Sequence, residues 1–243
     1  MGAIYRKEIT AFFSSLTGYI VIGVFLVILG LFMFIFPDTS LLEYDYATMD
    51  QLFSIAPLVF LFLIPAVTMR SFAEEKQRGT LEYLYTKPIK GWQIMWGKYL
   101  ANLTLVLIAL LPTLLYYYSV YQLGSPQGNL DSGAILGSYI GLFFLVGAFV
   151  AIGMFASAIS DNQIVGFILG TLICFIVHWA FLYLANLPLW GVDVSNFIQS
   201  LGLNSHYASI SKGALDSRDI VYFISVILGF IWLTQWTIEK ERG

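Results

Sequence analysis

Charged residues are scarce in this sequence. Only 11% of its 243 residues are Asp, Glu, Lys or Arg, whereas 58% are hydrophobic. A soluble domain usually carries about 25% charged residues, so a soluble protein of this length would lack the polar surface to cover its core. The composition excludes an ordinary soluble domain and indicates that lipid is the solvent for much of the chain.

Cysteine and histidine are almost missing. The single cysteine, Cys174, lies within an apolar run and has no partner for an internal disulfide, so we expect it to be a small buried residue. No H-E-x-x-H motif or Cys/His cluster is present, and the two histidines are far apart in the sequence. The sequence therefore predicts no zinc site.

Motifs for catalysis are missing as well. The sequence has no G-x-x-x-x-G-K-[ST] loop, which would hold nucleotide phosphates. It also has no G-x-S-x-G elbow, which would present a nucleophilic serine. We expect a chain that is not an enzyme and that binds no cofactor itself.

The sequence is rich in long apolar runs. Thr17–Phe36 contains twenty residues without a charge, and fourteen of them are Leu, Ile, Val or Phe. This length crosses a hydrocarbon core roughly 30 Å thick, and the summed insertion free energy is roughly −4 to −8 kcal/mol. The run is too long for the core of a cleaved signal peptide, and no small-x-small site follows it. We therefore predict a membrane span.

Five comparable runs follow, so the predicted fold class is all-α, an integral membrane bundle of six transmembrane helices. Helices are favoured because a span in lipid must satisfy its own backbone hydrogen bonds. Pro57, Pro65 and Pro112 predict local kinks without breaks. The whole of 1–243 is expected to form one transmembrane domain, with spans at 17–36, 51–69, 99–123, 134–160, 164–185 and 220–238.

The distribution of basic residues orients the predicted bundle. If the N-terminus is cytoplasmic, ten of the twelve Lys and Arg residues fall in cytoplasmic segments, and only Lys212 and Arg218 fall outside. The outer loops collect acidic residues. The positive-inside rule therefore predicts a multi-pass membrane protein with both termini cytoplasmic.

Two non-spanning segments carry further signals. Residues 1–16 place Tyr5, Ile9 and Phe12 at helical spacing opposite charged residues, which predicts an interfacial helix along the cytoplasmic leaflet. Residues 186–219 form a long, moderately apolar outer connection. We expect this connection to dip into the outer leaflet.

Ionisable residues are nearly absent from the predicted spans. His178 is the one Asp, Glu, His, Lys or Arg well inside a span. It is either a functional polar site or, as we favour, a neutral imidazole that hydrogen-bonds a neighbouring helix. Ion-coupled transporters usually carry acidic residues or broken helices at mid-membrane, so the energy for any transport must come from elsewhere.

The cytoplasmic segment 70–98 is longer than a simple connection between two spans requires. Glu74 and Arg78 stand at i, i+4, which supports a short helix, and Gly79 permits a turn. A second short helix is expected to begin near Gly91. The mixed charge and apolar ridge predict a docking surface for a soluble partner, although a solvated loop along the membrane is the alternative. The apolar stripe after the turn is formed by Leu81, Leu84 and Tyr85.

The same segment resembles a known family. The string Glu74-Glu75-Lys76-Gln77-Arg78-Gly79-Thr80-Leu81-Glu82, followed by Thr86-Lys87-Pro88-Ile89 and Gly97-Lys98, is similar to the cytoplasmic signature of ABC-2-type exporter permeases. A weaker match, His206-Tyr207 with Lys212-Gly213-Ala214-Leu215-Asp216-Ser217-Arg218-Asp219, resembles the segment before the last helix in the gliding-motility and copper-maturation branches. The chain is most similar to the gliding-motility-associated permease subunit.

This resemblance implies a cytoplasmic coupling helix between the second and third spans, resting on a separate ABC ATPase subunit that binds ATP and Mg. It also implies a second permease chain, identical or paralogous, and in the gliding branch an accessory membrane subunit. No nucleic acid is expected as a partner. The residues carried over as ATPase-coupling are Glu74, Glu75, Arg78, Gly79, Thr80, Leu81 and Glu82, and the apolar stripe adds Leu84 and Tyr85.

Two functional hypotheses follow. The first is the permease of an ATP-driven exporter, in which Glu74 and Glu75 reach basic residues of the ATPase and the apolar stripe fills its groove. The second is a membrane scaffold or mechanical transmitter through which nothing crosses. A stand-alone channel or carrier is disfavoured because charges are missing from the spans. A polar outward pathway would favour transport, and candidates for its lining are Asn102, Thr104, Thr113 and Ser138.

Overall fold

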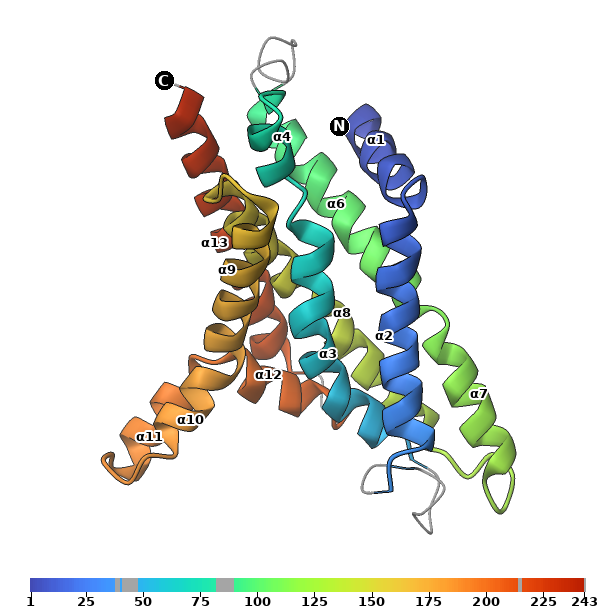
Figure 1. Cartoon of the computed structure of the whole chain (residues 1–243). Helices are drawn as coiled ribbons and strands as arrows, with labels where there is room; N and C mark the ends of the chain where they lie inside the picture. The colour runs from blue at the N-terminus through green and yellow to red at the C-terminus, as the bar shows by residue number, and fades with distance from the viewer. Residues whose placement is uncertain (38–39, 41–47, 82–89, 214–215, 243) are drawn as a thin grey trace.

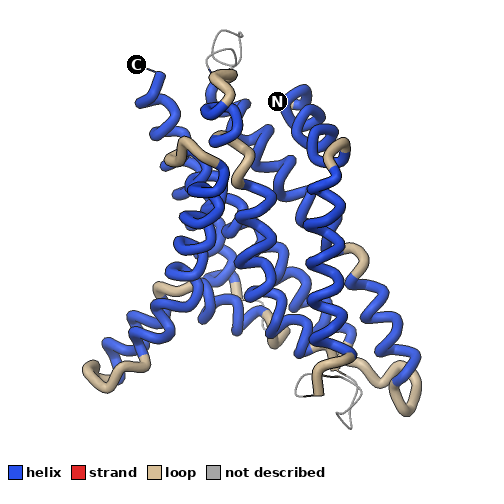
Figure 2. The backbone as a smooth tube through the Cα atoms, in the orientation of Figure 1, coloured by secondary structure: helices blue, strands red, loops and turns tan. Residues whose placement is uncertain are grey.

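The computed structural model describes residues 1–37, 40, 48–81, 90–213 and 216–242. These residues are almost entirely helical, and none of them lies in a strand (Figure 2). The predicted all-α fold class is therefore confirmed. Because no water is present in the hydrocarbon core to bond free N–H and C=O groups, such an apolar chain forms helices, which satisfy their backbone hydrogen bonds internally.

Among the described residues, five helical segments are long and apolar enough to cross a membrane, and a bent pair brings the number to six. The bent pair is α1 (Gly2–Phe13) with the helix that follows it, at an angle of 70°. The helices along the predicted spans are α2 (Leu16–Phe34), α3 (Asp50–Thr68), α6 (Gly91–Leu110) with α7 (Thr113–Leu123), α8 (Ser132–Ala158), α9 (Gln163–Phe175) with η1 (Ile176–Ala180) and α10 (Phe181–Ala185), and α13 (Ser217–Arg242).

The bend between α1 and α2 leaves α1 beside another helix of the bundle. Ser15 begins α2 by accepting a hydrogen bond from the Gly18 backbone N–H. Ile4 of α1 is buried close to Gly97 of α6, and the Tyr5 hydroxyl lies 3.2 Å from Thr104 Oγ1. The segment predicted as interfacial is thus a separate helix that packs on α6.

Helix α8 occupies the centre of the bundle, where it contacts α3, α6, α9, α12 and α13. Most of its second half is buried, from Leu145 to Ala158 with one partly exposed position. The closest approach is at Gly153, where an added Cβ would lie 2.2 Å from Thr68 Oγ1 of α3. Only glycine lets α3 and α8 come this close.

The prolines behave in two ways. Helix α3 runs unbroken through Pro57 and Pro65, in agreement with the prediction. At Pro112, a two-residue turn separates α6 from α7, yet residues 91–123 together count as one candidate span, in agreement with the predicted kink. The missing proline N–H removes a helical hydrogen bond, and the Thr113 hydroxyl bonds the Leu110 carbonyl oxygen at the freed end.

The long connection after the fifth span forms two short helices, α11 (Val192–Ser200) and α12 (Leu203–Ile210). Helix α12 packs into the bundle, because Leu203, Tyr207 and Ile210 are buried against it. Figure 1 shows α11 and α12 at one end of the molecule, while both termini and the short helix α4 (Ala73–Gln77) lie at the opposite end.

Candidate functional site

Helix α4 lies within the predicted coupling segment 70–98, of which the structure describes residues 70–81 and 90–98, and it is fixed to the bundle by α8. Ser157 of α8 accepts hydrogen bonds on its hydroxyl oxygen from the backbone N–H groups of Phe72 and Ala73, at 3.0 and 3.1 Å. The same hydroxyl donates to the Met69 carbonyl oxygen at 2.9 Å. One buried serine therefore satisfies three backbone groups at the bend between α3 and α4.

Beneath α4 lies a network of ion pairs, formed by Lys7, Glu8, Glu75 and Lys98. Lys98 Nζ is 1% exposed and lies 3.0 Å from both Glu8 Oε1 and Glu75 Oε1. Lys7 Nζ reaches Glu75 Oε1 at 2.7 Å. The network joins α1, α4 and α6, and it compensates charges that would be costly to bury alone.

Further polar contacts complete the environment of Lys98. Its ammonium donates to the Ser71 carbonyl oxygen at 2.6 Å and lies 5.1 Å from the centre of the Phe72 ring. Asn102, one helical turn further along α6, donates to the Ser71 hydroxyl at 2.8 Å. The bend before α4 is thus held by two residues of α6. In the network itself, Glu75 Oε2 is buried without a hydrogen-bond partner among the described residues.

The other side of α4 faces outward. Gln77, Arg78, Gly79 and Thr80 are all exposed, and Arg78 bonds Glu74 across one helical turn at 2.7 Å. Gly79 has a φ of 63°, the left-handed conformation that glycine adopts without strain. The Thr80 N–H then bonds the Glu75 carbonyl oxygen. Charged side chains on a well-formed turn are thereby presented at the end of the molecule that carries both termini.

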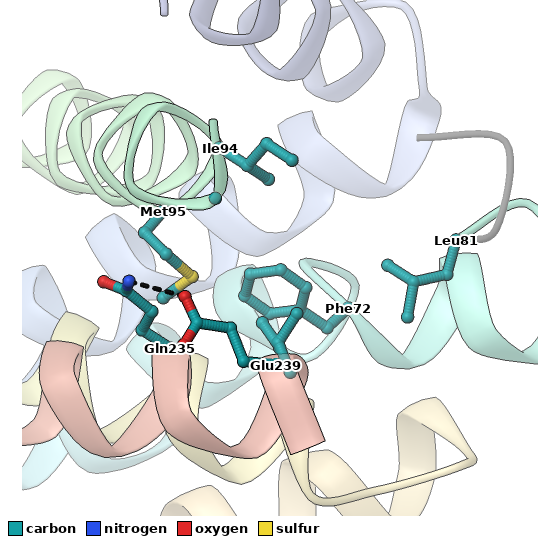
Figure 3. Close-up of a pocket in the computed structure, with 8 residues that line it drawn as sticks. Phe72, Leu81, Ile94, Met95, Gln235 and Glu239 are labelled. Atoms are coloured by element: carbon teal, nitrogen blue, oxygen red, sulfur yellow. Dashed lines mark hydrogen bonds between the residues drawn. The ribbon is translucent and has the colours of Figure 1, made fainter. Parts of the chain in front are cut away.

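The Leu81 side chain lies inside the molecule. It is 7% exposed and lines a small apolar pocket with Phe72 of the bend, Ile94 and Met95 of α6, and the last turns of α13. Figure 3 shows the Phe72 ring between Leu81 and Glu239, whose carboxylate accepts a hydrogen bond from Gln235 at 2.8 Å. The coupling segment is therefore anchored to α6 and α13 through this pocket.

The predicted coupling residues thus divide into three groups. Glu74, Arg78, Gly79 and Thr80 lie on the outward side. Glu75 and Leu81 were expected to reach a partner, but the structure places both inside the chain, because Glu75 pairs with two lysines and Leu81 fills an internal pocket. Glu82, Leu84 and Tyr85 lie outside the described residues.

Several residues of the site carry no role in the sequence interpretation. Ser157 has no local signal, since serine is common in packed spans. Lys98 does carry a local signal in the sequence, because a lysine beside an apolar run is costly to bury unless it is paired. Its acidic partners could not be identified from spacing, because Glu8 lies ninety residues away.

The four polar residues proposed for an outward pathway serve internal contacts. Asn102 bonds Ser71, Thr104 bonds the Leu100 carbonyl oxygen, and Thr113 contacts the Tyr139 hydroxyl at 3.0 Å. Ser138 donates to the carbonyl oxygens of Ala134 and Ser211. These side chains hold helices together within one chain.

Comparisons with known proteins bear on the whole of this arrangement. Across the ranges that the structure describes, no three His, Cys, Asp or Glu residues are grouped to hold a metal ion. Comparison with curated proteins gives no match. Residues 38–234 match a protein family described as ABC-2 family transporter protein.

Proposed function

Because the chain belongs to the ABC-2 transporter family, which supplies the non-catalytic membrane component of ABC transporters, we propose that the outward side of α4 receives a separate ATP-hydrolysing subunit. The docking surface consists of Glu74, Gln77, Arg78, Gly79 and Thr80. This chain then contributes no ATPase activity, and ATP and Mg bind the partner.

The observation that carries the proposal is the two-sided character of α4. Its outer side exposes Arg78, whose side chain is 69% exposed and forms an ion pair with Glu74 of the same turn. Its inner side places Glu75 in the network with Lys7 and Lys98. A partner that moves α4 would therefore also displace α6, because the buried pair of Glu75 with Lys98 does not separate without large cost.

The mechanical route continues from α4 into the membrane. Ser157 ties the bend to α8, and the bend itself is the direct continuation of α3. Closure of an ATPase dimer would thus push on α3 and α8 together. A partner can shift the bundle between two states only if it binds one of them more tightly. The attachment of α4 to the bundle lets the docking surface move with α3 and α8, so that the two states present it differently to the partner.

We also propose that the chain works as an exporter permease of the gliding-motility type in the bacterial inner membrane, paired with a second permease chain and an accessory membrane subunit. The resemblance of residues 74–82 and 206–219 supports this. Both termini and α4 lie at one end of the molecule (Figure 1), which supports a cytoplasmic location for all three when combined with the excess of Lys and Arg in those segments.

A second candidate function is a scaffold or mechanical transmitter through which nothing crosses. The observation that favours it is the engagement of Asn102, Thr113 and Ser138 in internal hydrogen bonds. In this case ATP-driven motion of α4 would act on a neighbouring protein. Both functions use the same docking surface and differ in whether a cargo accumulates in sealed vesicles.

The docking proposal is tested by charge reversal on the outer side of α4. In the complex reconstituted in nanodiscs with its ATPase, Arg78→Glu should weaken ATPase binding roughly tenfold, the size expected for a central charged contact, and should remove stimulated hydrolysis. Stability should change by less than about 1 kcal/mol, because the lost pair with Glu74 is at the surface.

Arg6→Glu is the matched control, since Arg6 is another exposed arginine at the same end of the molecule. It should leave binding and hydrolysis unchanged. Equal effects of the two substitutions, or none from Arg78→Glu, would contradict the docking surface. Glu75→Arg is unsuitable for this purpose, because it breaks the internal network.

A further inference from the structure

The end of α11 is held by side chains from the two helices that follow it, at the end of the bundle opposite both termini. His206 Nε2 of α12 lies 2.9 Å from the Ser200 carbonyl oxygen. The Tyr222 hydroxyl of α13 donates to the next carbonyl oxygen, that of Leu201, at 2.5 Å. Because the last carbonyl groups of a helix lack partners within it, these donors fix where α11 ends. The α4 site does not explain this cluster.

The His206 ring faces an oxygen acceptor at each of its two nitrogens. Nδ1 lies 2.6 Å from Asp219 Oδ1, and the two side chains are 17% and 11% exposed. Nε2 faces the Ser200 carbonyl oxygen. Since a carboxylate and a carbonyl oxygen only accept, both ring nitrogens must donate, and a ring with two N–H groups is the imidazolium cation.

Two further neighbours favour the positive ring. The carbonyl end of α11 carries the partial negative charge of a helix C-terminus, which attracts cations. The Tyr222 ring is stacked on His206 with centroids 3.9 Å apart and an interplanar angle of 21°, and an aromatic face attracts a cation placed over it. The cluster therefore binds the protonated ring better than the neutral one.

Among the described residues, the other ionisable groups of the elements around α12 make no hydrogen bond, ion pair or ring contact with His206. Asp219 is therefore the acid that faces the ring. The other groups are Asp50 of α3, Tyr139 of α8, His178 of η1, Asp193 of α11, Lys212 and Asp216 before α13, Arg218 at its start, and Glu239 and Lys240 at its far end.

We propose that His206 is a pH-sensitive latch: its imidazolium bridges Asp219 of α13 to Ser200 of α11, and loss of one ring proton opens the bridge. A neutral ring has a single N–H group, so one of the two oxygens would face a lone pair. The latched form binds one proton more than the released form, and a rise in pH therefore shifts the population towards release. Histidine ordinarily changes its charge between about pH 5 and pH 8.

The latch joins the last two spans at the end opposite the termini. The Ser195 hydroxyl of α11 donates to the Ala185 carbonyl oxygen at the end of α10, at 2.7 Å, and Asp219 lies in the first turn of α13. The protonated ring thus holds α10, α11 and α13 together, and release lets α11 move away from α13. The latch depends on neither ATP nor the docking surface on α4.

The test is hydrogen–deuterium exchange of the full chain in phosphatidylcholine nanodiscs at about pH 5 and about pH 8, corrected for the intrinsic pH dependence of exchange. Residues 192–202 should exchange roughly ten- to a hundredfold faster at the higher pH, because a hydrogen bond to a charged group is lost. The buried second half of α8 should not change. Nitrogen NMR of the histidine-labelled chain should show both His206 nitrogens protonated at the lower pH, and His206→Phe identifies the signal.

Asp219→Asn distinguishes a latch from a contact that is merely structural. An asparagine amide can donate to Nδ1, so a neutral ring keeps its N–H for Ser200, and residues 192–202 should then exchange slowly at both pH values. Asp193→Asn is the matched control, since Asp193 is an exposed acid of α11, and it should keep the pH dependence.

His206→Phe keeps a ring beside Tyr222 but removes both donors, so residues 192–202 should exchange fast at both pH values. Exchange that is independent of pH in the unmodified chain, a neutral His206 ring at the lower pH, or release that persists in Asp219→Asn would overturn the proposal.

Discussion

At the residue scale, Lys98 connects more of the coupling region than any other side chain described above. It contacts Glu8 of α1, Glu75 of α4 and the Ser71 carbonyl oxygen in the bend, and it is 1% exposed. Buried ion pairs of this kind contribute little net stability when complete, yet removing one partner leaves uncompensated charge. Such a network therefore specifies where α1 and α4 sit.

We predict that Lys98→Met lowers the free energy of unfolding by about 3–5 kcal/mol, because Glu75 and Glu8 lose their most buried counter-charge. Thermal or denaturant unfolding of the purified chain in detergent measures this loss. Arg6→Met removes an exposed charge from the same end of the molecule and should change stability by less than about 0.5 kcal/mol. Similar values for the two variants would show that the network has no structural role.

At the element scale, α3 packs against α8 near α4 and is bonded to α12 at its opposite end. Thr68 and Gly153 meet at the end near α4, while Phe53 of α3 accepts the hydrogen bond from Tyr207 at the opposite end. The two helices pack closely because the glycine has no side chain. Interfaces of this kind shift between discrete arrangements more readily than they deform.

We predict that Gly153→Ala destabilises the bundle by about 1–3 kcal/mol, because its Cβ would lie 2.2 Å from Thr68 Oγ1 and would force α3 and α8 apart. Gly229→Ala in α13 is the matched control, since an added Cβ there meets nothing within 4 Å. It should be neutral or slightly stabilising. The unfolding midpoints of the two variants make the comparison, and equal midpoints would contradict the close contact.

Sequence reasoning predicted the helical bundle well, because a long uncharged run has few other solutions in lipid. It failed where tertiary contacts decide the outcome. The sequence predicts a helix that begins near Gly91, as the structure shows, but predicts it to be short and separate from the span at 99–123, whereas residues 91–110 form the single helix α6. Glu75 reads as a surface charge from its neighbours in the sequence, but its lysine partners come from two other helices.

At the scale of the whole molecule, the chain has two chemically different ends. One end carries both termini and α4, and the other carries α11 and α12 (Figure 1). The ion-pair network lies at the first of these ends, beneath α4. Helix α3 joins the two ends, since Phe53 near its start accepts a hydrogen bond from Tyr207 of α12 and its last residue leads into the bend before α4.

The central claim, that a separate ATP-binding subunit docks on α4, is tested most directly by site-specific photo-crosslinking in cells. A crosslinking amino acid at position 78 is compared with one at Val192, which is 78% exposed at the opposite end of the molecule. The account predicts that position 78 captures a protein containing a P-loop nucleotide-binding domain and that position 192 does not. Capture of that protein from position 192, or from neither position, would contradict it.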